Sequence, residues 1–270
     1  GHVSGGLENG ETDRIEFAVQ QRQNAFSIQI WKRYEDDVNV FIRLPSGEVI
    51  GPIDERLGTQ RLQAGSTEIL LYYGEPSPYS VLQEIYLDFL PHNTFVTEGI
   101  WEIWLSAEKI VVGAYEMWMP SERALNRGTG FLFPTENLTF TIPSTAERVI
   151  TVGAYDALTG TYAPFSGRGE LLPRGAVKPD LVAPGVGIVT TGLNGGTTRV
   201  SGTSFATPFV TGSAALLMEW GIVKGNDAFL YGEKVKAYLR RGAQKLPGFA
   251  EYPNPLTGYG ALCVERSLPE

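Results

Sequence analysis

One stretch of the sequence combines a hydroxyl nucleophile with the backbone setting that such a nucleophile needs. It reads Ser201-Gly202-Thr203-Ser204-Phe205-Ala206-Thr207-Pro208, and the small and apolar residues that follow predict a helix over 204–220. At the first turn of a helix, free backbone N–H groups and the positive end of the dipole converge. There the Ser204 hydroxyl would attack a carbonyl carbon, and the Ser204 N–H would face the oxyanion that forms. Serine is also a favoured N-cap, so an ordinary cap is the alternative interpretation.

Two neighbours of Ser204 fit this placement. Gly202 permits a close approach of the preceding strand to the helix. Pro208 is expected in the first turn, where the N–H groups have few intrahelical partners to lose. The small residues of the helix predict close packing against neighbouring elements.

The elements that would position Ser204 alternate between strands and helices. Residues 149–154 predict a buried strand, short strands are expected at 181–184 and 188–191, and a second helix is expected over 233–241. Such alternation indicates part of a parallel α/β sheet.

The first half of the chain predicts strands only. Alternating or continuous β-rich runs occur at 15–19, 26–31, 38–44, 69–73, 84–89, 100–105, 114–119 and 138–142, with turn residues between them. Strands of this number with long connections favour an antiparallel sandwich of the jelly-roll type. We therefore expect two domains, a β-sandwich over 1–142 and an α/β portion over 143–270.

Charge separates the same two halves. The chain has 30 acidic and 22 basic residues, for a net charge of −8. The first 140 residues carry a net charge of −10 and the remaining 130 a net charge of +2. Because phosphate binding needs a basic face, nucleic acid is excluded as the main partner. No apolar run is expected to reach the length of about 18 residues that a membrane span needs, so no membrane partner is expected.

The cysteine count limits the remaining chemistry. Cys263 is the single cysteine of the chain. One thiol forms no internal disulfide, no redox pair and no cysteine-rich zinc site. Its simplest interpretation is a packed thiol, and no cofactor or metal is expected.

The serine stretch resembles the serine motif of the subtilisin-like serine proteases, usually Gly-Thr-Ser-x-Ala-x-Pro. Residues 143–268 match that family in order and spacing. The matching segments are the core strand at 145–154, the "fSs.G" loop at 162–169, the "kPdvvAPG" segment at 178–185 and the "GyG" at 258–260.

Residues 1–142 resemble the β-rich insert of the clostridial Csp-type germination proteases. The segments that carry this resemblance are 72–76, 99–101, 115–120 and 139–146. In that group a jelly roll interrupts the protease between the oxyanion asparagine and the serine segment. Gly1–Gly6 resembles the residues that follow the asparagine motif.

The resemblance implies a serine endopeptidase that forms an acyl-enzyme on Ser204, with the Ser204 N–H as one oxyanion donor. The family's order is Asp, His, Ser, so its aspartate, histidine and oxyanion asparagine are expected before Gly1. The chain is then the C-terminal portion of the protease and inactive alone. Its expected partners are the N-terminal half of the domain, a protein or peptide substrate and, through self-association, a second copy. The resemblance points to a bacterial, secreted or spore-associated location.

Two alternatives stay open for the parent protein. It is either an active peptidase or a pseudoprotease that keeps the fold without the chemistry, and a binding or regulatory module built on the jelly roll is the rival class. His2-Val3-Ser4-Gly5 echoes the family's histidine motif but lacks the helix that follows it. His92 follows Leu90-Pro91 and is expected in a surface loop.

Other residue groups of the sequence have two interpretations each. Trp31, Trp101, Trp104 and Trp118 are expected in core packing, with a glycan-binding face as the alternative. Residues 35–37 are expected in a solvated turn, with a calcium site as the alternative. Asp180 lies in the "kPdvvAPG" segment, so the resemblance makes it structural rather than the triad aspartate.

Overall fold

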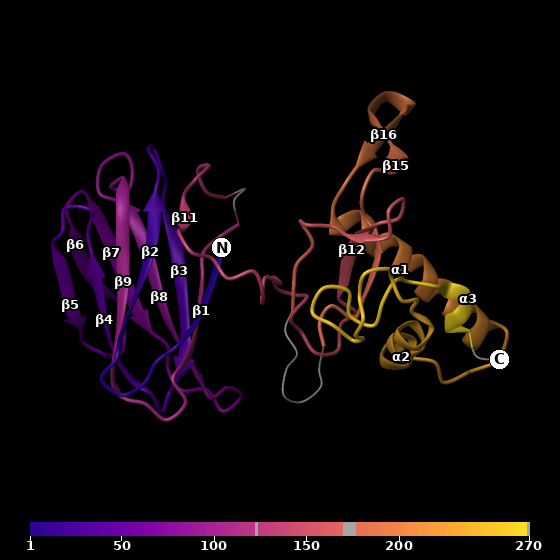
Figure 1. Cartoon of the computed structure of the whole chain (residues 1–270), viewed down its shortest axis with the longest axis horizontal. Helices are drawn as coiled ribbons and strands as arrows, with labels where there is room; N and C mark the ends of the chain where they lie inside the picture. The colour runs from indigo at the N-terminus through magenta and orange to yellow at the C-terminus, as the bar shows by residue number, and fades with distance from the viewer. Residues whose placement is uncertain (122–123, 170–176, 269–270) are drawn as a thin grey trace. The chain divides into compact units, whose positions relative to one another are not determined.

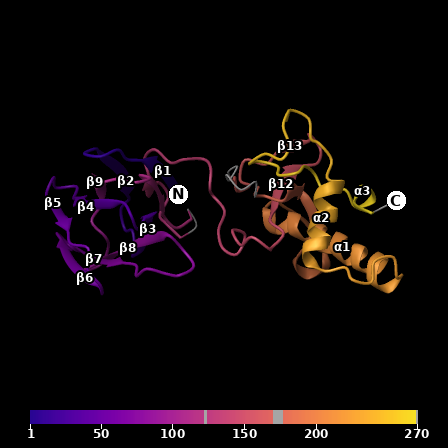
Figure 2. The same ribbon diagram turned by 90° about the horizontal axis from the view of Figure 1, so that it is seen from below.

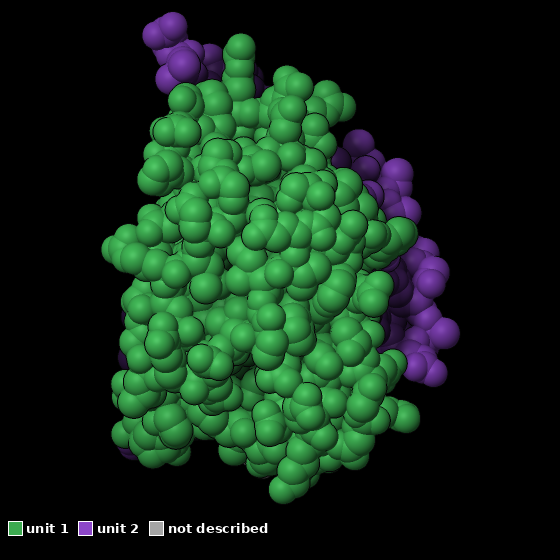
Figure 3. Space-filling model, turned by 90° about the vertical axis from the view of Figure 1, so that its left-hand side faces the viewer, with its two compact units in different colours: residues 1–135 green, residues 136–270 purple. Residues whose placement is uncertain are grey.

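The computed structural model describes residues 1–121, 124–169 and 177–268. The chain forms two compact units, Gly1–Thr135 and Glu136–Glu270 (Figures 1 and 3). The division comes a few residues before the expected boundary between 142 and 143. We call them unit 1 and unit 2 and describe each by itself.

Unit 1 consists of two antiparallel sheets that face each other (Figure 2). The spatial order in the six-stranded sheet is β1 (His2–Gly6), β10 (Ala114–Trp118), β3 (Phe26–Arg33), β8 (Leu82–Pro91), β7 (Thr67–Tyr73) and β6 (Gln60–Ala64). The order in the five-stranded sheet is β11 (Gly130–Phe131), β2 (Thr12–Val19), β9 (Gly99–Lys109), β4 (Asp37–Arg43) and β5 (Val49–Ile53).

The strand order of unit 1 follows from a chain that crosses repeatedly between the sheets. Strands β1-β10-β3-β8 follow one another in the first sheet, and β2-β9-β4-β5 follow one another in the second. This interleaving is the order of a jelly roll. The hairpin β6–β7 extends the first sheet by two strands, and β11 adds a short edge to the second.

The core of unit 1 follows from the alternation of its strands. Every second residue of β3 is buried, and β8 and β9 alternate in the same way. Phe17, Phe26, Phe89 and Trp101 meet in the centre, where the rings of Phe26 and Phe89 stack with centroids 4.9 Å apart. Trp101 is fully buried.

The tryptophans of unit 1 therefore divide into two kinds. Core packing accounts for Trp101 alone, whose indole N–H donates to the Thr97 carbonyl at 2.9 Å. Trp31, Trp104 and Trp118 are half-buried and lie on the outer faces of the sheets, because their strand neighbours point inward.

The expected strand at 138–142 is wrong. Leu138 has a φ of 53°, which extended backbone does not allow. The segment belongs to unit 2, where the Thr139 N–H donates to the Arg168 carbonyl at 3.0 Å and Phe140 packs beside Gly167. Strands β1, β5 and β6 were not predicted, since Gly, Pro and Gln break their apolar pattern.

Unit 2 contains the short strands and all the α-helices that the structure describes. Strands β12 (Val152–Asp156), β13 (Thr161–Tyr162) and β14 (Leu181–Pro184) form one sheet, and β15 (Ile188–Thr191) and β16 (Thr197–Val200) form a hairpin that projects from the unit (Figure 1). The helices are α1 (Thr203–Met218), continued by a π-helical turn at Glu219–Val223, α2 (Gly232–Gly242) and α3 (Val264–Ser267).

The parallel α/β sheet expected for this half is found in part. Strand β12 pairs with β14 in parallel, but it pairs with β13 in antiparallel fashion. Strand β12 begins at Val152, later than expected, because Val149 is exposed and Thr151 binds a side chain of the core. Helix α1 packs on both β12 and β14, with Ala206, Val210 and Leu217 buried against Ala154 and Ala183.

The helical run over Thr203–Val223 corrects one expectation from the sequence. By length and composition alone it is long and apolar enough to cross a membrane, with a mean hydropathy of 1.2. The expectation that no segment reaches this length is wrong, since the hydroxyl residues that interrupt the apolar run are only weakly polar. Only 28% of the apolar window is buried in the described structure, so most of the helix surface is uncovered.

Candidate functional site

Ser204 is the second residue of α1 and is exposed. Its hydroxyl makes no hydrogen bond to any other residue that the structure describes. The N–H groups of the first helical turn have no intrahelical acceptors.

The backbone before Ser204 is fixed by the end of β14. The Gly202 N–H donates to the Gly185 carbonyl at 2.8 Å, and Gly202 has a φ of 154°, which favours glycine. A Cβ on Gly185 would lie 2.6 Å from the Cβ of Ala154. Both glycines are therefore needed for the close approach of strand and helix.

The hairpin β15–β16 supports the same segment, and its second strand was not predicted from the sequence. The Gly187 N–H donates to the Ser201 hydroxyl at 3.0 Å, and the Arg199 guanidinium donates to the Gly187 carbonyl at 3.1 Å. The turn signal was present as Asn194-Gly195-Gly196, where Asn194 has a φ of 60°.

Pro208 lies one turn later than the sequence predicted. It is the sixth residue of α1 rather than a residue of the first turn. A residue at this place would normally donate its N–H to the carbonyl four residues before, which is that of Ser204. Because proline has no N–H, the Ser204 carbonyl lacks this intrahelical donor.

Asp180 holds together the elements behind Ser204. It is fully buried, and its carboxylate accepts the Thr151 N–H at 2.6 Å and the Arg240 Nε–H at 2.8 Å. The ammonium groups of Lys236 and Lys178 lie 3.1 and 3.3 Å from it. One carboxylate therefore joins the starts of β12 and β14 to α2.

The cluster of charged groups around Asp180 is largely shielded from solvent, as its member Lys178 indicates. Burial lowers the pKa of the Lys178 ammonium from its usual range, and the Asp180 carboxylate offsets only part of that effect. The same ammonium donates to the Val149 carbonyl at 2.9 Å and to the Thr151 hydroxyl at 2.7 Å. Asp180 thus has cationic partners and no imidazole, an arrangement that suits a structural role.

Both histidines of the chain belong to unit 1. His2 is buried in β1, where its Nε2 lies 2.6 Å from a Glu116 carboxylate oxygen and its ring stacks on Trp118. His92 is exposed in the loop after β8. Residues 136–270 contain no histidine, so unit 2 holds the serine without an imidazole base.

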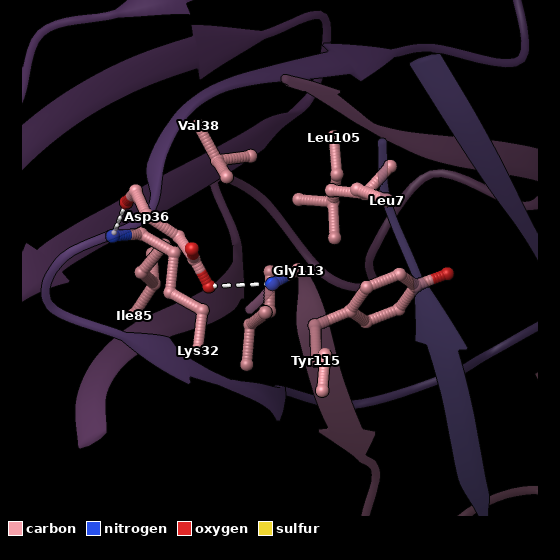
Figure 4. A pocket seen from close by; sticks show the side chains of 10 residues that line it. Leu7, Lys32, Asp36, Val38, Ile85, Leu105, Gly113 and Tyr115 are labelled. Carbon is pink, nitrogen blue, oxygen red and sulfur yellow. Dashed lines mark hydrogen bonds between the residues drawn. The ribbon is translucent and has the colours of Figure 1, made fainter. Parts of the chain in front are cut away.

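The acidic turn at residues 35–37 binds backbone. The Asp36 carboxylate accepts the N–H groups of Val111, Val112 and Gly113 at 2.7 to 2.9 Å (Figure 4 shows the bond to Gly113). The Lys32 ammonium donates to the Asp36 carbonyl at 2.7 Å. Burial opposes ionisation of Asp36, but the three N–H donors outweigh it and lower the pKa of its carboxyl. No group of three metal-ligating residues occurs in the part of the chain that the structure describes.

The segment that contains Ser204 matches a known protein family. The model of the subtilase family matches residues 126–261, which is half of the chain. The chain belongs to the subtilase family. The serine protease AprX of Bacillus subtilis (strain 168) is 33% identical over 154 residues, which cover 50% of this chain and 33% of AprX. Proteinase R of Parengyodontium album is 38% identical over 89 residues, which cover 33% of this chain and 21% of that protein.

A solved structure extends the likeness to both units of this subtilase. The structure of the Clostridium perfringens CspB protease matches 98% of this chain with a TM-score of 0.90 and 36% identity. The resemblance to the Csp-type proteases is thereby confirmed. The chain spans 55% of the CspB chain and a third of AprX.

Proposed function

We propose that this chain carries the nucleophile of a subtilisin-like serine endopeptidase, with Ser204 in that role. The observation that supports it best is the exposed Ser204 at the second residue of α1, directly after a glycine turn and inside the segment that matches the family. The hydroxyl oxygen would attack a peptide carbonyl and form an ester, and the Ser204 N–H would donate to the oxyanion.

A serine hydroxyl is a weak nucleophile until a neighbouring base takes its proton. Unit 2 has no histidine, and neither His2 nor His92 of unit 1 lies in the family's histidine motif, so the base would come from protease segments outside this chain. Those segments would also supply the aspartate that orients the histidine and the second oxyanion donor. The isolated chain should therefore be inactive.

The exposed side of α1 supports docking of those segments. Phe209 and Leu216 are 43% and 54% exposed and lie seven residues apart, with Gly212 between them. Residues with this spacing share one face of a helix. A further protein segment packed on this face would bury both side chains. We propose that unit 1 is the insert and unit 2 the protease part, with the boundary at Thr135 rather than at the expected residue 142. This division places α1 within the protease part.

The test is peptide hydrolysis by a chimera. The part of the CspB protease outside the matched region, joined to this chain, should hydrolyse a chromogenic peptide. Ser204→Ala should abolish the activity, whereas Ser213→Ala should not, since Ser213 is buried and donates to the Phe209 carbonyl at 2.7 Å. Activity that survives Ser204→Ala would refute the proposal.

A pseudoprotease or a jelly-roll binding module is the second candidate. Unit 1 supports it, because it is a sandwich of two sheets that can bind a partner on its outer faces. A folded chimera that neither hydrolyses peptides nor reacts with a fluorophosphonate would favour this function.

A further inference from the structure

The two outer faces of the sandwich carry similar side chains with different partners. On the five-stranded sheet, the indole N–H of Trp104 donates to Glu102 at 2.6 Å. The Arg14 guanidinium lies 4.5 Å from the Trp104 ring centre, and Arg43 pairs with Glu102 at 2.5 Å. Trp104 and Glu102 therefore each have a cation of the same chain beside them.

The six-stranded sheet has similar aromatic and acidic groups with fewer basic partners. Its Glu116 pairs with the His2 imidazole, whose Nε2 lies 2.6 Å from the carboxylate. Trp31 on β3 is directly opposite Glu84 on β8 and Glu116 on β10. Side chains in such positions have Cβ atoms about 5 Å apart, so the indole lies between two carboxylates. Trp31 is half-buried, and no cation or second ring lies over it among the residues that the structure describes.

The nearby side chains do not supply the missing cation. Glu84 accepts the Gln29 amide at 2.9 Å and has no cationic partner among the described residues. Its partial burial raises the pKa of its carboxyl, and the bond to Gln29 offsets that only in part. Arg33, the next residue on this face of β3, lies 3.4 Å from Glu35 instead.

We propose that this face, centred on Trp31 and Glu84, binds an arginine or lysine side chain of a basic protein segment. The ligand's cation would lie over the indole and beside the Glu84 carboxylate, as Arg14 and Arg43 lie beside Trp104 and Glu102 on the other sheet. Cations are attracted to an indole face and to carboxylates together. The net charge of −10 over the first 140 residues would draw such a segment towards unit 1.

The proposal concerns unit 1 and does not depend on the proposed peptidase activity. A probe for it is a short fluorescein-labelled peptide of alternating arginine and serine, followed by fluorescence anisotropy with the full chain. We expect saturable binding that weakens with added salt. The same peptide with citrulline in place of arginine keeps the shape without the charge and should not bind.

Variants locate the site on the sheet. Trp31→Leu and Glu84→Gln should each weaken binding about two- to fivefold, the range for one cation–π or ion-pair contact near a surface. Trp31→Phe should give an intermediate loss, and it replaces Trp31→Leu if that variant fails to fold in a thermal melt. Glu108→Gln is the matched control, because it removes the same charge from unit 1 on the other sheet, where Glu108 accepts Asn39 at 2.8 Å.

Three outcomes would overturn the proposal. Equal losses from Glu84→Gln and Glu108→Gln would mean that net charge alone attracts the peptide. Binding of a neutral chitin oligosaccharide that Trp31→Leu abolishes and Glu84→Gln leaves unchanged would assign the face to glycans. Absence of any arginine-peptide binding at low salt would leave the face without the proposed ligand.

Discussion

The two units of the chain differ in how completely each covers its own apolar surface. In unit 1 the central strands alternate between buried and outer residues, and the inner faces of both sheets meet in one continuous core. In unit 2 the longest helix buries Ala206, Val210 and Leu217 but leaves Phe209 and Leu216 exposed. The difference indicates that unit 1 is complete as a folding unit, whereas unit 2 presents a face that suits a further protein segment.

The largest effect should appear when the units are separated. Residues 1–135 expressed alone should unfold in one cooperative thermal transition, because their core contacts are internal. Residues 136–270 alone should bind a hydrophobic dye and aggregate, because of the exposed face of α1. Dye binding and scanning calorimetry measure both. If unit 2 alone unfolded in one cooperative transition and bound no dye, the proposed difference between the two units would be wrong.

The next largest effect should come from Asp180→Asn in the full chain. The substitution leaves Lys236 and Arg240 around a neutral amide, and loss of one partner from a buried ion pair costs about 3–5 kcal/mol. The transition of unit 2 should move to a lower denaturant concentration, and that of unit 1 should not move. Glu219→Gln is the control, since its pair with Lys224 is exposed and should leave both transitions unchanged. A shift of unit 1 instead would contradict this assignment.

A smaller and pH-dependent effect is expected from Asp36→Asn in unit 1. An amide cannot accept all three N–H groups, and a buried donor without an acceptor costs about 1–3 kcal/mol. Because folding lowers the pKa of this carboxyl, its stabilisation is present above the unfolded pKa of about 3.9 and is lost as the pH falls through the folded value.

Denaturant titrations at several pH values test this prediction. The wild type and Asp36→Asn should differ at neutral pH and converge in acid. Asp37→Asn is the control, since its side chain is exposed on the same turn. A difference that stays constant into acid would mean that the charge of Asp36 does not stabilise unit 1.

Residue pattern predicted the parts of the fold where one face is buried. The strands at 26–31, 84–89 and 100–105 were located from it, because burial imposes a strict period on them. Helix α1 was located from its small and apolar residues instead. The residue pattern did not predict the structure where a segment has no regular alternation of buried and exposed residues. Leu138 adopts a left-handed φ, and β6 pairs through its backbone although its residues are mostly polar.

The site was predictable only in its local part. The motif located Ser204 at the start of a helix, whereas the place of Pro208 in the second turn depends on where α1 begins. Two partners of Asp180, Arg240 and Lys236, come from α2, some 60 residues later in the chain. No local sequence pattern predicts these contacts. The contrast between Trp31 and Trp104 likewise depends on which residues are opposite each other in the sheets.

Fluorophosphonate labelling of Ser204 tests the central claim most directly. The isolated chain should not label, because unit 2 offers a hydroxyl without a base. Addition of the part of CspB outside the matched region should produce labelling that Ser204→Ala abolishes, in a complex whose formation light scattering confirms. Robust labelling of the isolated chain, lost in Ser204→Ala, would contradict the account and show that this chain already contains its base.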